Sequence, residues 1–201
     1  MLPIVAVTNE KTVKQLAEIL NQFFTVSVVT DNIIKIETNS KVLLVNSNNI
    51  RELKLDDGIL IVSDSCETIF EECFCPIVIA DGNKSFLCEK INSKTQYITC
   101  GMSAKDTISF SSIDVDEVSV CLMREIKKLN GETVEPYEVT VYSKTNIANY
   151  SPFCLLCAFA LITVLGVSIN GLKLCLEWNS YLLKEKVRRY SDGPIVKRLI
   201  S

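Results

Sequence analysis

Residues 3–24, PIVAVTNEKTVKQLAEILNQFF, set the architecture expected at the start of the chain. Pro3–Val7 is a short apolar run rich in β-branched residues, and the turn-like segment Thr8–Glu10 follows it. The apolar residues after this turn recur at spacings of three and four, which marks one face of a helix. They are Val13, Leu16, Ala17, Leu20 and Phe24. The pattern predicts a strand, a short loop and a helix that runs through Phe24.

The segments after this opening alternate between strand and helix patterns. Gly58–Val62 and Pro76–Ala80 are continuous apolar runs, typical of strands buried on both faces of a parallel sheet. We expect further strands at Thr25–Val29, Ile33–Glu37, Lys41–Val45 and Gln96–Thr99, a loop at Asp81–Asn83 and a short helix at Lys84–Ile91. This order predicts an α/β fold with a mostly parallel sheet flanked by helices.

The pattern of apolar and polar residues changes after Asp106. Apolar and polar residues alternate in Thr107–Ile113, Val118–Met123 and Tyr137–Tyr142, and Asn130-Gly131 precedes the last of these runs. Such alternation is typical of antiparallel strands with one face toward water. We therefore expect a small antiparallel patch near residues 107–142.

Two helices are expected in the last quarter of the chain. They cover Asn146–Val167 and Leu172–Val187, with Asn170-Gly171 between them. Residues 188–201 are basic, and we expect them to form a loose extension. We therefore divide the chain into one domain, 1–187, and a basic tail, 188–201. The apolar residues of the last helix fit core packing, and an interface is the alternative interpretation. They are Leu172, Leu174, Leu176 and Trp178.

Composition excludes several classes of function. Hydrophobic residues make up 48% and charged residues 22% of the 201 residues, which are ordinary values for a globular domain. The net charge is −3, and the sequence has no long cluster of Lys and Arg, so nucleic acid is not an expected partner. The chain has no histidine, which removes the commonest general base and the usual nitrogen ligand of zinc.

The nine cysteines are expected to be reduced thiols in the cytoplasm. Cys73 and Cys75 form a C-x-C pair, and Cys154 and Cys157 a C-x-x-C pair inside an apolar run. Redox and metal-binding pairs usually lie at an exposed position with charge nearby, so both pairs read as core packing and no metal site is predicted.

The apolar segment Phe153–Ile169 raises the question of a membrane helix. It is about 17 residues long, at the short edge of what spans a bilayer. A buried core helix is the favoured interpretation. The alternative is a membrane helix anchored by the downstream Lys184, Lys186, Arg188 and Arg189.

Three places in the sequence resemble the ATP-dependent Mur ligase family, whose members join an amino acid to a carboxylate through an acyl phosphate. The first is Ile4–Thr12, which is similar to the family's strand and phosphate loop, V-T-G-T-N-G-K-T-T. This chain lacks two residues of that loop and has Glu10 in place of its last glycine. A shorter loop offers fewer backbone N–H groups to phosphates, and a carboxylate there repels a polyanion.

The other two places follow in the family's order. Pro76–Asn83 and Tyr97–Ser103 resemble the family's v-i-N-a-D-D and v-i-t-f-G, here with Asp81 and Gly101. Thr145–Asn149 leads into an apolar helix and then Leu165–Val167, which is similar to the family's H-N-x-x-N helix start and L-G-I. Thr145 replaces the family's histidine. The alternative for Asn149 is that it simply caps the apolar helix.

The resemblance implies the P-loop NTPase-like central domain of a Mur ligase, with tentative nucleotide-binding residues. These are Lys11, Thr12, Asn146 and Asn149. We find no catalytic residues, no equivalent of the family's Asp-His pair, and only Asp64 or Glu67 as stand-ins for its Mg²⁺-binding glutamate. The family's C-terminal amino-acid-binding domain also has no counterpart.

Two hypotheses follow from these observations. The first is a non-catalytic Mur-ligase-like protein that binds a partner protein or a nucleotide. The second is an ATP-dependent, Mg²⁺-dependent amide ligase that a second Mur-like chain completes. The broken phosphate loop favours the first hypothesis, because phosphoryl transfer depends on positioning and electrostatic stabilisation by that loop.

Overall fold

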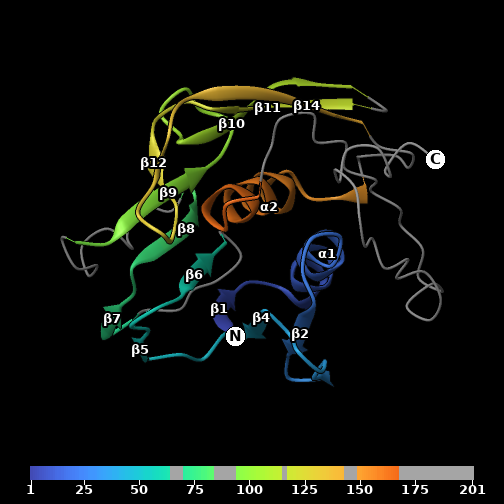
Figure 1. The fold of residues 1–201 in the computed structure, drawn as a ribbon, viewed down its shortest axis with the longest axis vertical. Helices are drawn as coiled ribbons and strands as arrows, with labels where there is room; N and C mark the ends of the chain where they lie inside the picture. The colour runs from blue at the N-terminus through green and yellow to red at the C-terminus, as the bar shows by residue number, and fades with distance from the viewer. Residues whose placement is uncertain (64–69, 84–93, 115–116, 143–148, 168–201) are drawn as a thin grey trace.

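The computed structural model describes residues 1–63, 70–83, 94–114, 117–142 and 149–167 (Figure 1). The predicted opening is present: β1 (Leu2–Val7) leads directly into α1 (Glu10–Leu20). The last residue of the helix is Leu20, four residues before Phe24, where we expected the helix to end, and Asn21 is its cap residue. The N–H group of Phe24 still donates to the carbonyl oxygen of Leu20, so the chain makes one further turn before it leaves the helix.

Ten of the described strands form one sheet, in the order β14-β11-β10-β9-β8-β6-β1-β4-β2-β3. Besides β1 they are β2 (Val26–Val29), β3 (Ile34–Lys35), β4 (Val42–Asn46), β6 (Ile59–Val62), β8 (Ile77–Asp81), β9 (Gln96–Cys100), β10 (Ile108–Ile113), β11 (Glu117–Leu122) and β14 (Tyr137–Tyr142). The pairings from β2 through β10 are parallel, while β3, β11 and β14 join antiparallel. The predicted α/β fold, with its mostly parallel sheet and an antiparallel patch near 107–142, is therefore confirmed.

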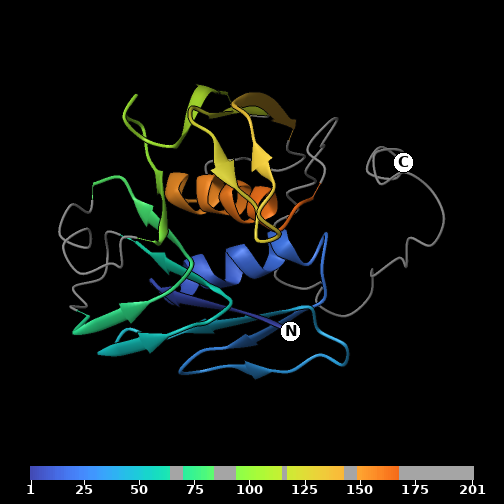
Figure 2. The same ribbon diagram turned by 60° about the vertical axis from the view of Figure 1, so that its left-hand side comes forward.

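Both described helices pack on the same face of this sheet. The sheet curves around α1 and α2 (Pro152–Val164), which lie side by side and form one hydrophobic core with the strands (Figures 1 and 2). The strand residues in this core alternate along each strand, as Ile4 and Ala6 do in β1 and Ile59 and Ile61 do in β6. This is the period of two that a strand requires when one face is packed against helices.

The helix α2 is a core element and is shorter than predicted. Its residues from Cys154 to Val164 are all buried, as expected for a helix that is apolar on every side. It begins at Pro152 rather than near Asn146, because Ser151 caps it by accepting a hydrogen bond from the Cys154 N–H (3.1 Å). Our alternative that Asn149 caps this helix is thus wrong. No helix in the described segments combines the length and apolarity needed to cross a membrane.

The second face of the sheet carries a smaller hydrophobic cluster. Its members alternate with those of the main core, so that Val5, Val7, Leu60 and Val62 point away from the helices. Two short parallel strands, β5 (Glu52–Lys54) and β7 (Glu72–Phe74), lie over this cluster. We did not predict either strand, nor the hairpin of β12 (Ile126–Lys127) and β13 (Thr133–Val134) beside α2.

Several predicted segments lie outside the described residues. They are the helices at Lys84–Ile91 and Leu172–Val187, the start of the helix at Asn146, and the basic tail 188–201. The division of the chain into 1–187 and 188–201 stays a prediction for the same reason.

Candidate functional site

The carboxyl end of β1 lies where the strand order of the sheet reverses. β1 pairs with β4 on one side and with β6 on the other, so the chain leaves β1 in one direction and later continues in the other. Ligands of open α/β sheets bind at such a point, outside the carboxyl ends of the strands. Buried polar residues gather along this edge, each at the end of its strand. They are Thr8, Asn46, Ser63 and Asp81.

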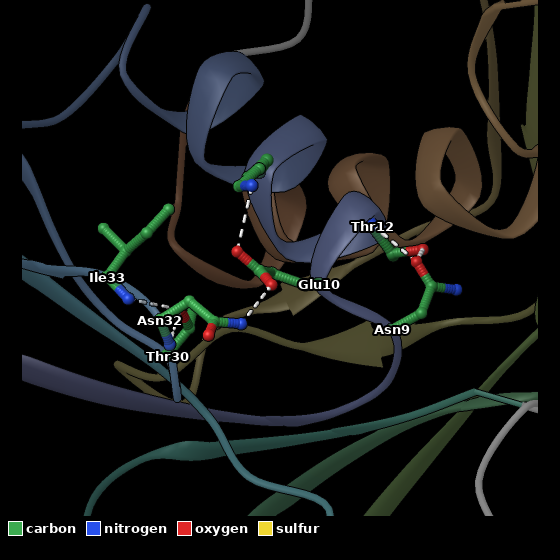
Figure 3. A network of polar contacts seen from close by, with 7 residues as sticks. Asn9, Glu10, Thr12, Thr30, Asn32 and Ile33 are labelled. Carbon is green, nitrogen blue, oxygen red and sulfur yellow. Dashed lines mark hydrogen bonds and ion pairs between the residues drawn. The ribbon is translucent and has the colours of Figure 1, made fainter.

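The connection between β1 and α1 consists of two residues, Thr8 and Asn9. Asn9 is the N-cap of α1, and its Oδ1 atom accepts hydrogen bonds from the Thr12 N–H (2.9 Å) and the Thr12 hydroxyl (3.1 Å) (Figure 3). The backbone N–H of Val13 is bonded to the Asn9 carbonyl oxygen. The Thr12 N–H, which has no partner in the helical backbone, is therefore occupied by the cap, while the Val13 N–H makes the first regular bond of the helix.

The side chain of Asn46 holds this connection from β4. In the amide orientation that pairs both of its ends, the Asn46 nitrogen donates to the carbonyl oxygens of Ala6 (2.7 Å) and Thr8 (3.1 Å). Thr8 is fully buried, and its hydroxyl has no hydrogen-bond partner among the described residues. The turn is thus fixed by a neighbouring strand and presents no hydroxyl of Thr8 to solvent.

Glu10 is the first residue of α1 and points sideways from the helix. Its carboxylate accepts hydrogen bonds from Lys14 (2.9 Å) and from the side chain of Asn32 (2.8 Å) (Figure 3). Hydrogen bonding to Lys14 and then to Asn32 lowers the pKa of Glu10 below its ordinary value. The carboxylate is therefore charged at neutral pH and adds a negative charge to the end of α1 that attracts anions.

The Asn32 end of this contact belongs to a tight turn between β2 and β3. The Thr30 hydroxyl accepts hydrogen bonds from the N–H groups of Asn32 (3.2 Å) and Ile33 (3.0 Å), and the Thr30 N–H donates to the Ile33 carbonyl. Glu10 thus ties the start of α1 to the carboxyl end of β2. Sequence reasoning found Glu10 but missed Asn32, because the two residues come together only when β2 lies beside β4.

The four tentative nucleotide-binding residues have different surroundings. Lys11 is exposed on the first turn of α1, whereas Thr12 is buried and bonded to Asn9. Asn149 is exposed, and its carbonyl oxygen accepts a hydrogen bond from the Gln15 side chain (2.9 Å), which places it beside α1. Asn146 lies outside the described residues, as do Asp64 and Glu67. Their roles at a nucleotide stay predictions.

A second polar feature lies at the ends of β8 and β9. The Asp81 carboxylate accepts hydrogen bonds from the N–H (2.9 Å) and the side chain (3.0 Å) of Asn83. The buried carboxylate of Asp106 accepts one from the Ser103 N–H (2.9 Å). It lies against Gly82 and Gly101, where a Cβ atom on either glycine would collide with it.

The sequence contained a signal for this feature that we did not use. A glycine directly after a strand often marks a close approach of other atoms to the backbone, and both Gly82 and Gly101 follow strands. We interpreted Gly101 only as part of a family pattern. The structure gives it a steric role, since it leaves room for Asp106.

The cysteines of the two predicted pairs are packed in the two cores. Cys73 and Cys75 are buried in the smaller cluster, and Cys154 and Cys157 are buried in α2. Burial raises the pKa of Cys75 to about 11 and raises that of Cys157 well above its ordinary value. Such thiols are inert packing residues, as predicted. The described residues contain no group of three or more acidic or cysteine side chains arranged to hold a metal ion.

Comparisons with known proteins place this site in a structural context. The sequence matches no protein-family profile, and it matches no curated protein. The structure is similar to UDP-N-acetylmuramate:L-alanyl-gamma-D-glutamyl-meso-diaminopimelate ligase from Neisseria meningitides, with a TM-score of 0.50 and 12% identity. That match covers 84% of this chain and 62% of the ligase.

Two further solved structures are similar at lower scores. A MurF ligase from Thermotoga maritima, in complex with ADP, has a TM-score of 0.47 and 8% identity, over 84% of this chain and 46% of that one. MurF from Acinetobacter baumannii has a TM-score of 0.49 and 10% identity, over 84% and 43%. This chain spans less than two thirds of the length of each of these structures. At 12% identity, the likeness to the Neisseria ligase shows that this chain has the α/β fold of a Mur ligase domain.

Proposed function

We propose that this chain is a non-catalytic Mur-ligase-like protein that acts by binding a partner protein. The observation that carries the proposal is the two-residue connection between β1 and α1, with Asn9 capping the helix. A phosphate-binding loop needs several residues whose N–H groups point inward at the phosphates. Two residues, one of them fully buried, do not form such a cradle.

Electrostatics and hydrogen bonding at this end of α1 support the same proposal. In the family pattern, the hydroxyl at Thr12 is the group that reaches the bound Mg²⁺. Here that hydroxyl donates to Asn9 instead. The charged Glu10 adds a negative charge beside the same helix end. ATP and Mg²⁺ are therefore not cofactors in this proposal.

The proposed partner is a protein, and a second Mur-like chain is the first candidate. We propose a cytoplasmic location, which suits the buried free thiols of the described segments.

Calorimetric titration of the full chain with ATP·Mg²⁺ tests the non-catalytic part of the proposal. We expect no binding at millimolar nucleotide. The proposal fails if ATP binds in the micromolar range and if Lys11→Ala abolishes that binding. Lys105→Ala is the matched control, because Lys105 is an exposed lysine in the loop after β9.

The competing function is an amide ligase completed by another chain. One observation favours it: Lys11 is exposed at the carboxyl edge of the sheet, on the first turn of α1. Under this alternative, the Lys11→Ala variant loses nucleotide binding while it keeps its fold.

The partner-binding part needs a separate measurement. A tagged chain, produced at its natural level in its own cells, is purified gently and weighed by native mass spectrometry. We expect a complex of fixed stoichiometry with a second protein. Recovery of the chain only as a free monomer would contradict this part, whatever the outcome of the ATP titration.

A further inference from the structure

One half of the second sheet face carries partly buried apolar residues, with the exposed Ile34 at its outer strand and the buried Ser27 among them. The residues Val29 and Ile34 lie opposite each other in the β2–β3 pair, and Val29 lies opposite Val45 in β4. Val45 in turn lies opposite Val5, which points away from the helices. Residues directly opposite each other share a face of the sheet. Ile34 therefore points away from α1 and α2.

We call this half the open face, and we define it by six apolar residues of β1 to β4 and the segment after β3. They are Pro3, Val29, Ile34, Ile36, Leu43 and Val45. Ile34 is 79% exposed and Ile36 is 63% exposed, so the described part of the chain leaves them uncovered. Met1, which is 69% exposed, extends the face beyond Pro3.

The other half of the same face shows what such a surface requires. Phe70, Cys73 and Cys75 cover β1, β6 and β8 there, together with the partly buried Leu53 and Leu55. The two halves adjoin at Pro3, because a Cβ atom on Gly58 would lie 3.1 Å from both Leu55 and Pro3 side-chain atoms. Among the described residues, this cover thus stops at the middle of the sheet. An adjoining exposed apolar surface is typical of an interaction site.

We propose that residues 172–189 of this chain dock on the open face. The described chain stops at Val167, and 34 residues follow it. Within them Lys173, Glu177, Ser180, Lys184 and Arg188 recur at spacings of three and four, the spacing of residues that share one side when a segment is helical. The other sides carry mostly apolar residues. They include Leu172, Leu176, Trp178, Leu182, Leu183 and Val187.

The described chain ends near the amino-terminal edge of the sheet. Gly166 lies beside the side chain of Lys128. The neighbouring Lys127 exchanges two hydrogen bonds with Gln96, the first residue of β9. The β5–β7 pair lies at this same amino-terminal edge of the sheet, where the residue before β9 is bonded to the residue after β7. The chain therefore leaves the described fold near the amino-terminal end of β9.

The distribution of charge also favours docking of residues 172–189 on the open face. Seven of the 21 Lys and Arg residues and three of the 24 Asp and Glu residues lie in positions 168–201, so this segment carries a net charge of +4. The rest of the chain then carries −7. A basic amphipathic segment is attracted to an acidic body, and its apolar side matches the open face.

The only tryptophan of the protein, Trp178, lies in the proposed segment and reports on its docking. In the full chain we expect blue-shifted emission and slow quenching by acrylamide. The Ile34→Asp/Ile36→Asp variant should shift the emission to the red and raise the quenching constant several-fold. The matched control is Ile113→Asp/Met123→Asp, which alters two exposed apolar residues at the other end of the sheet and should leave Trp178 unchanged.

Three outcomes would overturn the proposal. The first is red-shifted, freely quenched Trp178 emission in the unmodified chain. The second is Trp178 emission that stays the same when Ile34 and Ile36 are changed. The third is Trp178 emission that depends on protein concentration. The last would mean that the segment docks on a second copy. Circular dichroism checks that each variant is folded.

A photo-crosslinker at position 178 gives an independent measurement in an otherwise unmodified chain. With Trp178→p-benzoylphenylalanine, we expect intramolecular crosslinks to peptides that contain residues 29–45. Crosslinks confined to α1 or α2, or to another protein, would contradict docking on the open face. This inference does not depend on whether ATP binds.

Discussion

The carboxylate of Asp106 fills the space in which a side chain on Gly101 would begin. This relationship joins the end of β9 to the start of the segment that leads into β10, and the Ser103 N–H fixes the carboxylate from the intervening turn. The buried Asp106 carboxylate is thus held by the backbone N–H of Ser103, and it occupies space that is free only because residue 101 is a glycine.

We expect Gly101→Ala to destabilise the protein by about 1–3 kcal/mol, because the added methyl group must displace Asp106. Urea unfolding measures the change. Lys105→Ala, an exposed change in the same loop, should stay within about 0.5 kcal/mol of the unmodified protein. In an Asp106→Ala background the Gly101→Ala change should cost less, since the clash is gone. An equal cost in both backgrounds would contradict the steric role.

The Asn9 cap offers a second prediction. Asn9→Ala should lower the free energy of unfolding by about 0.5–2 kcal/mol, because the Thr12 N–H loses its partner at the helix start. Asn9→Asp keeps an acceptor and adds a charge that suits a helix N-terminus, so it should retain most of the stability. If Ala and Asp proved equally destabilising in thermal unfolding, the cap would not be the source of the effect.

The partly buried Glu18 predicts an unusual dependence on pH. Burial raises the pKa of Glu18, and its Oε2 atom has no hydrogen-bond partner among the described residues. A carboxyl group with a raised folded-state pKa costs stability above that pKa, and the cost disappears as the pH falls. Glu18→Gln should therefore stabilise the protein at neutral pH. The gain should vanish as the pH approaches the ordinary glutamate value of 4.5.

Glu10→Gln is the control, because it should change the free energy of unfolding at neutral pH in the opposite direction to Glu18→Gln. The pKa of Glu10 is lowered, so its charged form contributes stability above the ordinary value, and this contribution is lost as the pH falls through the lowered pKa. Glu10→Gln should destabilise at neutral pH and converge with the unmodified protein in acid. Chemical unfolding at a series of pH values separates the two variants. If the free energy of unfolding changed with pH in the same way in both variants, the opposite pKa shifts of Glu10 and Glu18 would be refuted.

A pair of hydroxyls, that of the buried Thr163 and that of the partly buried Tyr137, joins α2 to the antiparallel strands. The hydroxyls of Tyr137 and Thr163 lie 2.7 Å apart, and the Thr163 hydroxyl lies 2.8 Å from the Phe159 carbonyl oxygen. Thr163→Val should cost about 1–3 kcal/mol, because it leaves the Tyr137 hydroxyl without this partner. Tyr137→Phe combined with Thr163→Val should cost less than the sum of the single changes. Additive costs in urea unfolding would show that the two groups are independent.

Much of the fold could be predicted because its strands carry strong local signals. The apolar runs at Gly58–Val62 and Pro76–Ala80 became the central strands β6 and β8, and the alternating runs became the antiparallel strands. β5 and β7 could not be predicted in this way. Each strand has only three residues, and the first and last of them are exposed. The two strands pair only because segments far apart in the sequence meet over the smaller cluster.

The site was predictable in outline only. The sequence marked a phosphate loop that is broken at Asn9 and Glu10 and keeps Thr12. It did not reveal that Asn9 bonds to Thr12 or that Glu10 reaches Asn32. These contacts depend on side-chain direction and on the position of β2 in the sheet. The start of α2 was misplaced for a simpler reason, since Ser151-Pro152 is a stronger helix start than Asn149 and we gave it too little weight.

The central place of β1 has a consequence for how the protein is made. Leu2 pairs with Val42 and Ile4 pairs with Ile59, so β1 waits for both of its neighbours to be synthesised after it. Until then its apolar side chains face solvent or a chaperone. Closure of the sheet therefore depends on contacts between residues far apart in the chain, which makes folding slow relative to a helical bundle of this size. During this interval a newborn chain is open to pairing with the wrong strand.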